Sequence, residues 1–271
     1  MFAAILALTP SGPFRHKDRE LQYVRNYKPN RDDVQHLRIL LHGPVGAGKS
    51  SFINSVNNAV RGRITGKPLA GYKTYKIQKG QPGNARDFYP FVFSDTMGLE
   101  MEKQGGVNPE DIKLALKGHM KDGYTFNPAS KLSSDSQYYN AEPTQNDKVH
   151  VLVCVVPADK VALLTEDYVK KMKDIRALAS ELEIPQVAII TKIDLACEEI
   201  QKDLKNVYKS KYLKETMKNF SDLVGIPMNY IFPVKNYSEE INIKNDVDSL
   251  ILSVLRRIID FGEEFINDME T

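Results

Sequence analysis

Several features that would mark other classes of protein are missing or scarce in this sequence. Its 271 residues include no tryptophan and only two cysteines. Cys154 and Cys197 have no zinc-ligand spacing, so the sequence predicts neither a disulfide framework nor a cysteine metal site. Lysine and arginine number 37 against 35 acidic residues, a net charge of +2. Because this balance gives no strongly basic surface, nucleic acid is not an expected partner.

Long hydrophobic runs are absent as well. No stretch approaches the roughly 20 apolar residues that span a bilayer, so we expect no transmembrane segment. Residues 1–8 are apolar, but they lack a basic segment and are at the short end for a secretory signal. Hydrophobic residues make up 42% of the chain and charged residues 27%, as in ordinary globular proteins. The sequence therefore favours a cytoplasmic protein.

What is present is an alternation of apolar runs and helical patterns, which is typical of a wound α/β sheet. We expect residues 1–33 to form a tail and a short helix that packs on the main domain at 34–271. Residues 121–147 are polar and predict an insert that is either functional or mobile. Strands are expected at 37–41, 72–79, 88–94, 149–156, 186–191 and 229–234. Helices are expected at 15–27, 49–60, 108–120, 161–182, 197–223 and 246–267.

The most informative segment runs from Gly43 to Ser50. It reads Gly-Pro-Val-Gly-Ala-Gly-Lys-Ser and matches the P-loop pattern Gly-x-x-x-x-Gly-Lys-Ser/Thr at every position. Backbone N–H groups of such a loop, at the positive end of a helix, wrap a diphosphate. We expect Lys49 to bridge the outer phosphates and Ser50 to ligate Mg²⁺; a chance glycine-rich turn is the alternative. The expected nucleotide contacts here are Val45, Gly46, Ala47, Gly48, Lys49, Ser50 and Ser51.

A second segment, Asp95-Thr96-Met97-Gly98, follows the expected strand at 88–94. The Asp95 carboxylate could reach the magnesium shell through water. Gly98 has no Cβ, so its backbone N–H could approach the γ-phosphate. Four residues of this kind occur often by chance, but their place some 46 residues after Lys49, beyond two further expected strands, gives them weight.

Two further segments bear on the base. Thr191-Lys192-Ile193-Asp194 follows a buried strand, where Asp194 can accept hydrogen bonds from the guanine N1–H and amino group. Adenine offers neither donor and would leave a desolvated charge unpaired. The Lys192 stem can lie over the base; a simple surface pair with Asp194 is the alternative. The loop Val234-Lys235-Asn236 would offer backbone N–H groups to the guanine oxygen.

The order of these segments predicts a P-loop NTPase of the Ras-like G-domain type. We expect a mostly parallel six-stranded sheet with one antiparallel edge strand and helices on both faces. GTP or GDP with Mg²⁺ is the expected ligand. An ATP-dependent kinase or ATPase is the alternative, and it requires the segment 191–194 to be accidental.

The chain resembles the interferon-induced protein 44 family. The resemblance rests on residues 38–56, 72–77, 95–99, 234–238 and 250–257. It covers about residues 15–265 and implies a GTP-binding domain of the wider dynamin- and septin-like class, in the cytoplasm. It also implies a link to the interferon response and to antiviral or growth-restraining activity. Protein partners, including a second copy of the chain, are a further implication.

Hydrolysis is an open question in the sequence. Leu99 stands where Ras-type enzymes carry the glutamine that orients the attacking water, and Val45 stands where they carry a glycine. Both residues argue against fast hydrolysis, although septin- and dynamin-like proteins hydrolyse GTP without that glutamine. We therefore assign no catalytic residue. A slow GTPase switch and a GTP- or GDP-stabilised interaction module without significant hydrolysis are the two alternatives.

The threonine expected to sense the γ-phosphate through Mg²⁺ is equally open. Thr65 and Thr74 are the candidates between the P-loop helix and Asp95. Spacing from Lys49 favours Thr65, and position just before the second strand favours Thr74. Either residue could instead serve the loop or the strand alone.

Overall fold

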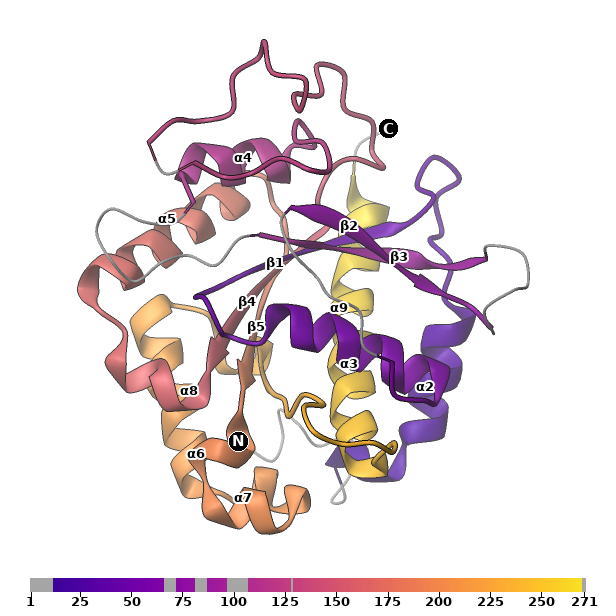
Figure 1. Cartoon of the computed structure of the whole chain (residues 1–271), viewed down its shortest axis with the longest axis vertical. Coiled ribbons are helices and arrows are strands. Elements are labelled where there is room, and N and C mark those ends of the chain that lie inside the picture. Colours follow the sequence, from indigo (N-terminus) through magenta and orange to yellow (C-terminus); the bar gives the residue numbers. More distant parts are fainter. Residues whose placement is uncertain (1–11, 66–71, 81–86, 97–106, 128, 270–271) are drawn as a thin grey trace.

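The computed structural model describes residues 12–65, 72–80, 87–96, 107–127 and 129–269 (Figure 1). Six strands form one sheet in the order β2-β3-β1-β4-β5-β6. All neighbouring strands in it are parallel except β2 and β3, which pair antiparallel. The strands are β1 (Leu37–His42), β2 (Lys73–Gln78), β3 (Phe88–Asp95), β4 (Val151–Pro157), β5 (Gln186–Thr191) and β6 (Ile231–Pro233). The predicted fold, a mostly parallel six-stranded sheet with an antiparallel edge, is confirmed.

Helices cover both faces of the sheet (Figure 1). The helices are α2 (Lys17–Asn26), α3 (Lys49–Arg61), α4 (Pro109–Leu116), α5 (Glu166–Glu181), α6 (Ile193–Ala196), α7 (Glu198–Lys202), α8 (Lys211–Val224) and α9 (Asn245–Asp268). Helices α3 and α9 pack together on one face, with α2 along α9, whereas α4, α5 and α8 form a second group. None of the described helices is long and apolar enough to cross a bilayer.

Burial along the strands follows from this layering. Every residue of β4 is buried, because helices cover both faces of a central parallel strand. In the edge strand β2, only Ile77 is buried and the other residues are partly or fully exposed. Helix α9 lies so close to the sheet that a Cβ on Gly262 would come within 2.3 Å of the Leu37 Cδ1 atom. Glycine is therefore the residue that permits this close packing.

Helix boundaries differ from the expected ones where turn chemistry intervenes. Helix α4 ends at Leu116 because Gly118 takes a left-handed conformation, with φ of +83°, against Asp147. Helix α5 begins late because Thr165 caps it, its hydroxyl accepting from the Tyr168 N–H. A 3₁₀ turn precedes it at Ala158–Leu163. The expected helix at 197–223 is broken into α7, a 3₁₀ turn at Leu204–Tyr208 and α8.

The polar segment at 121–147 is anchored to the domain in its described part. Phe126 is buried, and the Tyr124 hydroxyl donates to the Asp111 carboxylate of α4 at 2.8 Å. The Leu132 N–H donates to the other oxygen of Asp111 at 2.7 Å. From β1, Arg38 donates to a backbone carbonyl of the segment at 3.0 Å. This insert is thus packed on α4 and the sheet.

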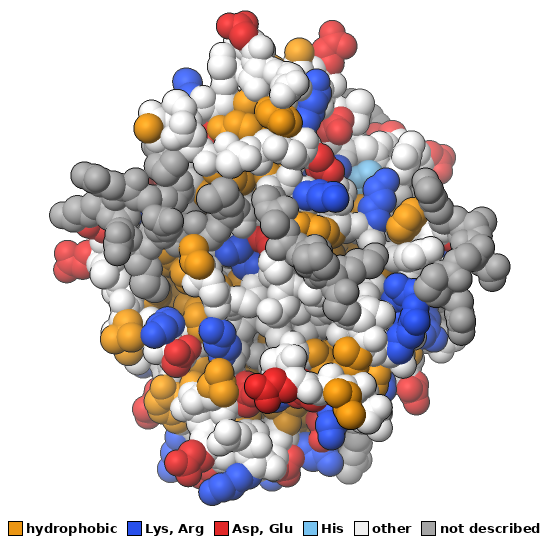
Figure 2. Space-filling view, viewed as in Figure 1, with side chains coloured by type: hydrophobic (Ala, Val, Ile, Leu, Met, Phe, Trp, Pro, Cys, Tyr) orange, Lys and Arg blue, Asp and Glu red, His pale blue; other side chains and the backbone are white. Residues whose placement is uncertain are grey.

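Helix α2 joins the domain through polar contacts with α9. The hydroxyl of Tyr23 donates to Asp260 and that of Tyr27 donates to Glu263, both at 2.6 Å. Arg256 of α9 pairs with Glu20 at 2.8 Å. The domain boundary near residue 34 stays a prediction. Positive and negative side chains are interspersed on the face in Figure 2, in line with the small net charge.

Candidate functional site

The P-loop runs from the end of β1 into α3 and depends on three left-handed glycines. Gly43 has φ of +146°, and a Cβ there would lie 2.0 Å from the Val155 carbonyl oxygen of β4. Gly46 has φ of +73°, and Gly48, at +92°, is the N-terminal cap of α3. The first N–H groups of a helix have no partner within it. The loop therefore places the first backbone N–H groups of α3 at the positive end of the helix, where an anion is stabilised.

Lys49 is a buried cation folded back over this loop. Lys49 is only 7% exposed, and its Nζ atom donates to the carbonyl oxygens of Gly43 and Pro44, each at 3.1 Å. Burial lowers the pKa of Lys49, while Asp95 and Cys154 act in the opposite direction. An ammonium has three donors, so one is left for an anionic oxygen.

Ser50 and Asp95 meet directly beneath the loop. The Ser50 hydroxyl donates to Asp95 Oδ2 at 2.7 Å. The Asp95 Oδ1 atom is buried and has no hydrogen-bond partner among the described residues. Burial raises the pKa of Asp95, and Ser50 and Lys49 partly oppose that rise. A hydroxyl and a carboxylate oxygen are hard ligands of the kind Mg²⁺ takes, usually with water and phosphate completing the shell. These residues therefore fit a magnesium ion.

The two candidate threonines lie elsewhere in this structure. Thr65 is at the C-terminal end of α3, where its N–H and hydroxyl both donate to the Asn58 side chain, at 2.7 and 2.9 Å. Thr74 pairs with Ser94 across β2 and β3, so its side chain lies on the sheet face opposite Asp95. Neither lies beside the Ser50 hydroxyl, and a metal-linked role for either stays a prediction.

Of the two positions relevant to hydrolysis, the structure describes Val45 but not Leu99. Gly98 and Leu99 lie outside the described residues. Val45, at the tip of the P-loop, is 69% exposed. Its branched side chain thus stands at the mouth of the loop, where it would meet a group approaching the phosphates.

The predicted base-recognition segment is fastened to the P-loop. Thr191, the last residue of β5, is buried, and its hydroxyl donates to the Ala47 carbonyl at 2.6 Å. Lys192 then takes a left-handed conformation with φ of +55°. Ile193 is buried and starts α6. This sharp turn leaves the Asp194 side chain partly exposed, at 19%, next to the loop after β6.

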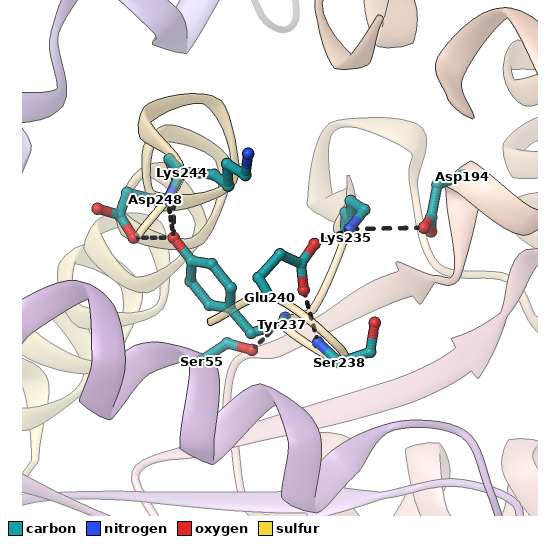
Figure 3. Close-up of polar contacts among 8 residues, drawn as sticks. All are labelled: Ser55, Asp194, Lys235, Tyr237, Ser238, Glu240, Lys244 and Asp248. Atoms are coloured by element: carbon teal, nitrogen blue, oxygen red, sulfur yellow. Dashed lines mark hydrogen bonds and ion pairs between the residues drawn. The ribbon is translucent and has the colours of Figure 1, made fainter. Parts of the chain in front are cut away.

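The loop after β6 closes the site from the other side. The Val234 N–H donates to a carbonyl of β5 at 2.8 Å. The Asn236 amide donates to the Gly48 carbonyl at 3.1 Å, and its oxygen is buried without a partner among the described residues. Lys235 lies between these two anchors, with Nζ 3.7 Å from Asp194 Oδ2 (Figure 3). The phosphate loop, the base segment and the closing loop are thus in contact.

Contacts of Tyr237 that no motif predicted also hold the closing loop in place. The Tyr237 N–H donates to the Ser55 hydroxyl of α3 at 3.0 Å. The Tyr237 hydroxyl accepts from the Lys244 N–H at 2.9 Å and donates to Asp248 of α9 at 2.7 Å (Figure 3). Burial raises the pKa of Tyr237. No local pattern predicts this role for the tyrosine, because its partners belong to other elements, α3 and the start of α9.

The fold and these contacts define the chain as a P-loop domain of the G-domain class. A family-model comparison finds no match. The chain is 32% identical over 263 residues to human (Homo sapiens) "Interferon-induced protein 44-like", covering 94% of this chain and 58% of the relative. It is 33% identical over 258 residues to "Interferon-induced protein 44" of Mus musculus, covering 92% and 60%. Over nearly its whole length the chain is thus homologous to proteins named interferon-induced protein 44, and it spans somewhat less than two thirds of these relatives.

Solved structures show weaker similarity. A probable GTP-binding protein engB aligns with 84% of this chain and 99% of its own, at a TM-score of 0.46 and 14% identity. Toc33 from Arabidopsis thaliana in complex with Mg²⁺ and GMPPNP aligns with 97% of each chain, at a TM-score of 0.49 and 15% identity.

Proposed function

We propose that this chain is a guanine-nucleotide-binding domain that takes GTP or GDP with Mg²⁺ and acts as a slow GTPase switch. One observation carries the proposal: side chains of the base segment and the closing loop bond the P-loop itself. Thr191 donates to the Ala47 carbonyl, and Asn236 donates to the Gly48 carbonyl. A phosphate cradle and a base pocket built on one rigid frame suit a ligand that has both parts.

The base selectivity follows from Asp194. A carboxylate accepts from the guanine N1–H and amino group, whereas adenine leaves it unpaired. Displacement of a fluorescent GTP analogue by unlabelled nucleotides tests this directly. We expect GTP to displace the probe at least about 100-fold better than ATP, because a site built to hydrogen-bond a ligand rejects one that lacks the donors. Equal displacement by GTP and ATP would contradict guanine selectivity.

Magnesium would be held by Ser50 and Asp95 together with the phosphates. When bound, it neutralises the charge on the outer phosphates. The Asp95 Oδ1 atom has no hydrogen-bond partner within the part of the chain that the structure describes, and this supports the assignment, since a cation or its water would satisfy that oxygen. The protein's own contribution is to keep the Ser50 hydroxyl and the carboxylate side by side.

The proposal also includes slow hydrolysis of GTP. Val45, at the mouth of the P-loop and 69% exposed, would crowd an incoming catalytic group, and Leu99 cannot hydrogen-bond water. Single-turnover phosphate release at low and high protein concentration tests the activity. We expect a slow rate that rises with concentration if a second copy completes the site. Release no faster than in buffer at every concentration would leave the second function, a nucleotide-stabilised interaction module.

The biological setting comes from the names of the relatives. They are interferon-induced proteins, and we propose that this chain acts in the same response, with an antiviral role and through protein partners. Both cysteines are free, which accords with the cytoplasm as its setting. Transcript and protein levels before and after interferon treatment test the link; no induction would contradict it.

A further inference from the structure

The Lys235 ammonium lies between two carboxylates at the edge of the base site. It contacts Glu240 directly and lies 3.7 Å from Asp194 Oδ2 (Figure 3). The three side chains are 19%, 16% and 19% exposed for Lys235, Glu240 and Asp194. A lysine this sheltered is a fixed feature of the site, unlike the solvated lysines of the outer surface.

The backbone around Lys235 is held on both sides. The preceding Val234 N–H donates to β5, and the following Asn236 amide donates to the Gly48 carbonyl. Glu240 is fixed in turn, since one of its oxygens takes the lysine and the other accepts the Ser238 N–H at 2.9 Å. Burial raises the pKa of Glu240, but the bonds from Lys235 and Ser238 prevail and lower it to about 2. Glu240 is therefore ionised at neutral pH and holds the ammonium in place.

The chemistry of guanine leaves a task for such an ammonium. The base presents two donors, N1–H and the amino group, and one acceptor, the 6-oxo oxygen. The Asp194 carboxylate has two acceptor oxygens and no donor, so it satisfies the N1–H and the amino group but not the 6-oxo oxygen. The Val234 N–H, one of the backbone donors expected for that oxygen, is already bonded to β5. A side-chain donor placed beside the carboxylate would therefore help to complete the match. Lys235 has three donors, and Glu240 occupies one of them.

We propose that the Lys235 side chain, held beside Asp194 by Glu240, donates a hydrogen bond to the 6-oxo group of the bound guanine. This inference rests on the proposed function of the site. Lys235 and Asp194 then read the whole hydrogen-bonding edge of the base, and Glu240 acts as a positioning residue.

The opposite role for Lys235 would be to neutralise Asp194 and compete with guanine for it. The distances favour our assignment. The ammonium contacts Glu240, whereas 3.7 Å to Asp194 is too long for a hydrogen bond. The Asp194 oxygens are thus left for the donors of the base. The two roles predict opposite effects when the ammonium is removed.

Dissociation constants of GTP and 6-thio-GTP for the full chain test the proposal, because sulfur is a poor hydrogen-bond acceptor. We expect Lys235→Met to weaken GTP binding about tenfold, the scale of one hydrogen bond to a charged group. The same change should weaken 6-thio-GTP much less, so the preference for GTP shrinks. Lys235→Arg, which retains donors, should keep more of that preference.

Glu240→Gln tests the positioning role. It should weaken GTP binding in the same direction but less than Lys235→Met, and it should add little in the double variant. Lys244→Met, at an exposed lysine of the same loop, is the matched control and should bind like the unaltered chain. Thermal unfolding of each variant reports its folding.

Three outcomes would overturn the inference: tighter GTP binding by Lys235→Met, unchanged binding, or an equal loss for GTP and 6-thio-GTP. The last outcome would assign Lys235 a purely structural role. Failure of the proposed function looks different, since the unaltered chain would then show no preference for GTP over ATP. If GTP is preferred over ATP but the preference for GTP over 6-thio-GTP is undiminished in Lys235→Met, this inference alone is contradicted.

Discussion

The Thr191 hydroxyl donates a 2.6 Å hydrogen bond to the Ala47 carbonyl, joining residues 144 positions apart in the chain. Both residues are buried. Through this bond the end of β5, three residues before Asp194 of α6, is fixed to the P-loop. The separation between the phosphate cradle and the base carboxylate is therefore set by the protein before any ligand arrives, which lowers the ordering cost of binding.

Removing this hydroxyl should loosen both halves of the site. Thr191→Val keeps the shape of the side chain but leaves the buried Ala47 carbonyl without its donor, at a cost of about 1–3 kcal/mol in unfolding free energy. GTP affinity should fall as well. Thr191→Ser, which retains the hydroxyl, is the matched control for chemical denaturation and nucleotide titration. Equal stability of the valine and serine variants would contradict a structural role for the bond.

The P-loop glycines should differ in their tolerance of a side chain. Gly43→Ala places a Cβ 2.0 Å from the Val155 carbonyl and should lower the unfolding free energy by more than about 3 kcal/mol. Gly46 has no atom within 4 Å of that position. Gly46→Ala should therefore cost only the left-handed backbone, about 1–2 kcal/mol. Urea denaturation separates the two, and a similar loss for both would contradict the close approach of β4.

Asp95 should be needed for the effect of magnesium on nucleotide binding. Asp95→Asn removes the charge beside the Ser50 hydroxyl, and we expect GTP affinity at saturating Mg²⁺ to fall about 10–100-fold, as for the loss of a charged partner. Affinity in EDTA should change much less. Asp87→Asn is the control, at the opposite end of β3, where the carboxylate is exposed and pairs with Lys79. An Asp95 variant with undiminished magnesium dependence would refute the assignment.

The main motifs could be predicted from the sequence because each is local. The P-loop needs one strand, one loop and one helix in succession, and the segment at 191–194 needs only a strand end. The sheet followed from apolar runs such as β4, which is buried on both faces. Strand and helix patterns of this kind are determined within a few residues.

What could not be predicted depends on side-chain contacts that strand and helix patterns do not encode. The Tyr237 hydroxyl meets Asp248 of α9, and its N–H meets Ser55 of α3. Asp111 holds the insert through Tyr124, a contact that the polar composition of the segment, which predicted an insert either functional or mobile, did not indicate. The Thr65 hydroxyl donates to the Asn58 side chain of α3, and the spacing of Thr65 from Lys49 does not reveal this contact. The contact between Tyr237 and Ser55, 182 positions apart, exists only once the sheet has brought these elements together.

Acid should destabilise the fold through buried histidines. His150 is fully buried and accepts the Arg38 N–H at 2.8 Å. Burial lowers its pKa from 6.5 to about 4. Between these values the unfolded chain binds the proton more tightly, so the unfolding free energy falls as the pH drops from about 6.5 towards 4. The contribution of His150 is on the order of 3 kcal/mol.

The pH slope has more than one source. Burial also lowers the pKa of His36 to about 4 and that of His42 to about 3. His150→Gln should therefore flatten the dependence of unfolding free energy on pH without abolishing it. Denaturant titrations between pH 7 and 4 check this, and an unchanged slope in the variant would show that His150 titrates alike in both states.

The central claim is that Asp194 recognises guanine. It is tested most directly by replacing the Asp194 carboxylate with an amide. Asp194→Asn presents a donor where the guanine amino group needs an acceptor, and it suits the 2-oxo group of xanthine instead. Dissociation constants of the variant for GTP and xanthosine triphosphate are the measurement. We expect GTP binding to fall by about 100-fold or more while xanthosine triphosphate becomes the preferred ligand. GTP binding that is unchanged in the variant, with no gain for xanthosine triphosphate, would contradict the guanine site.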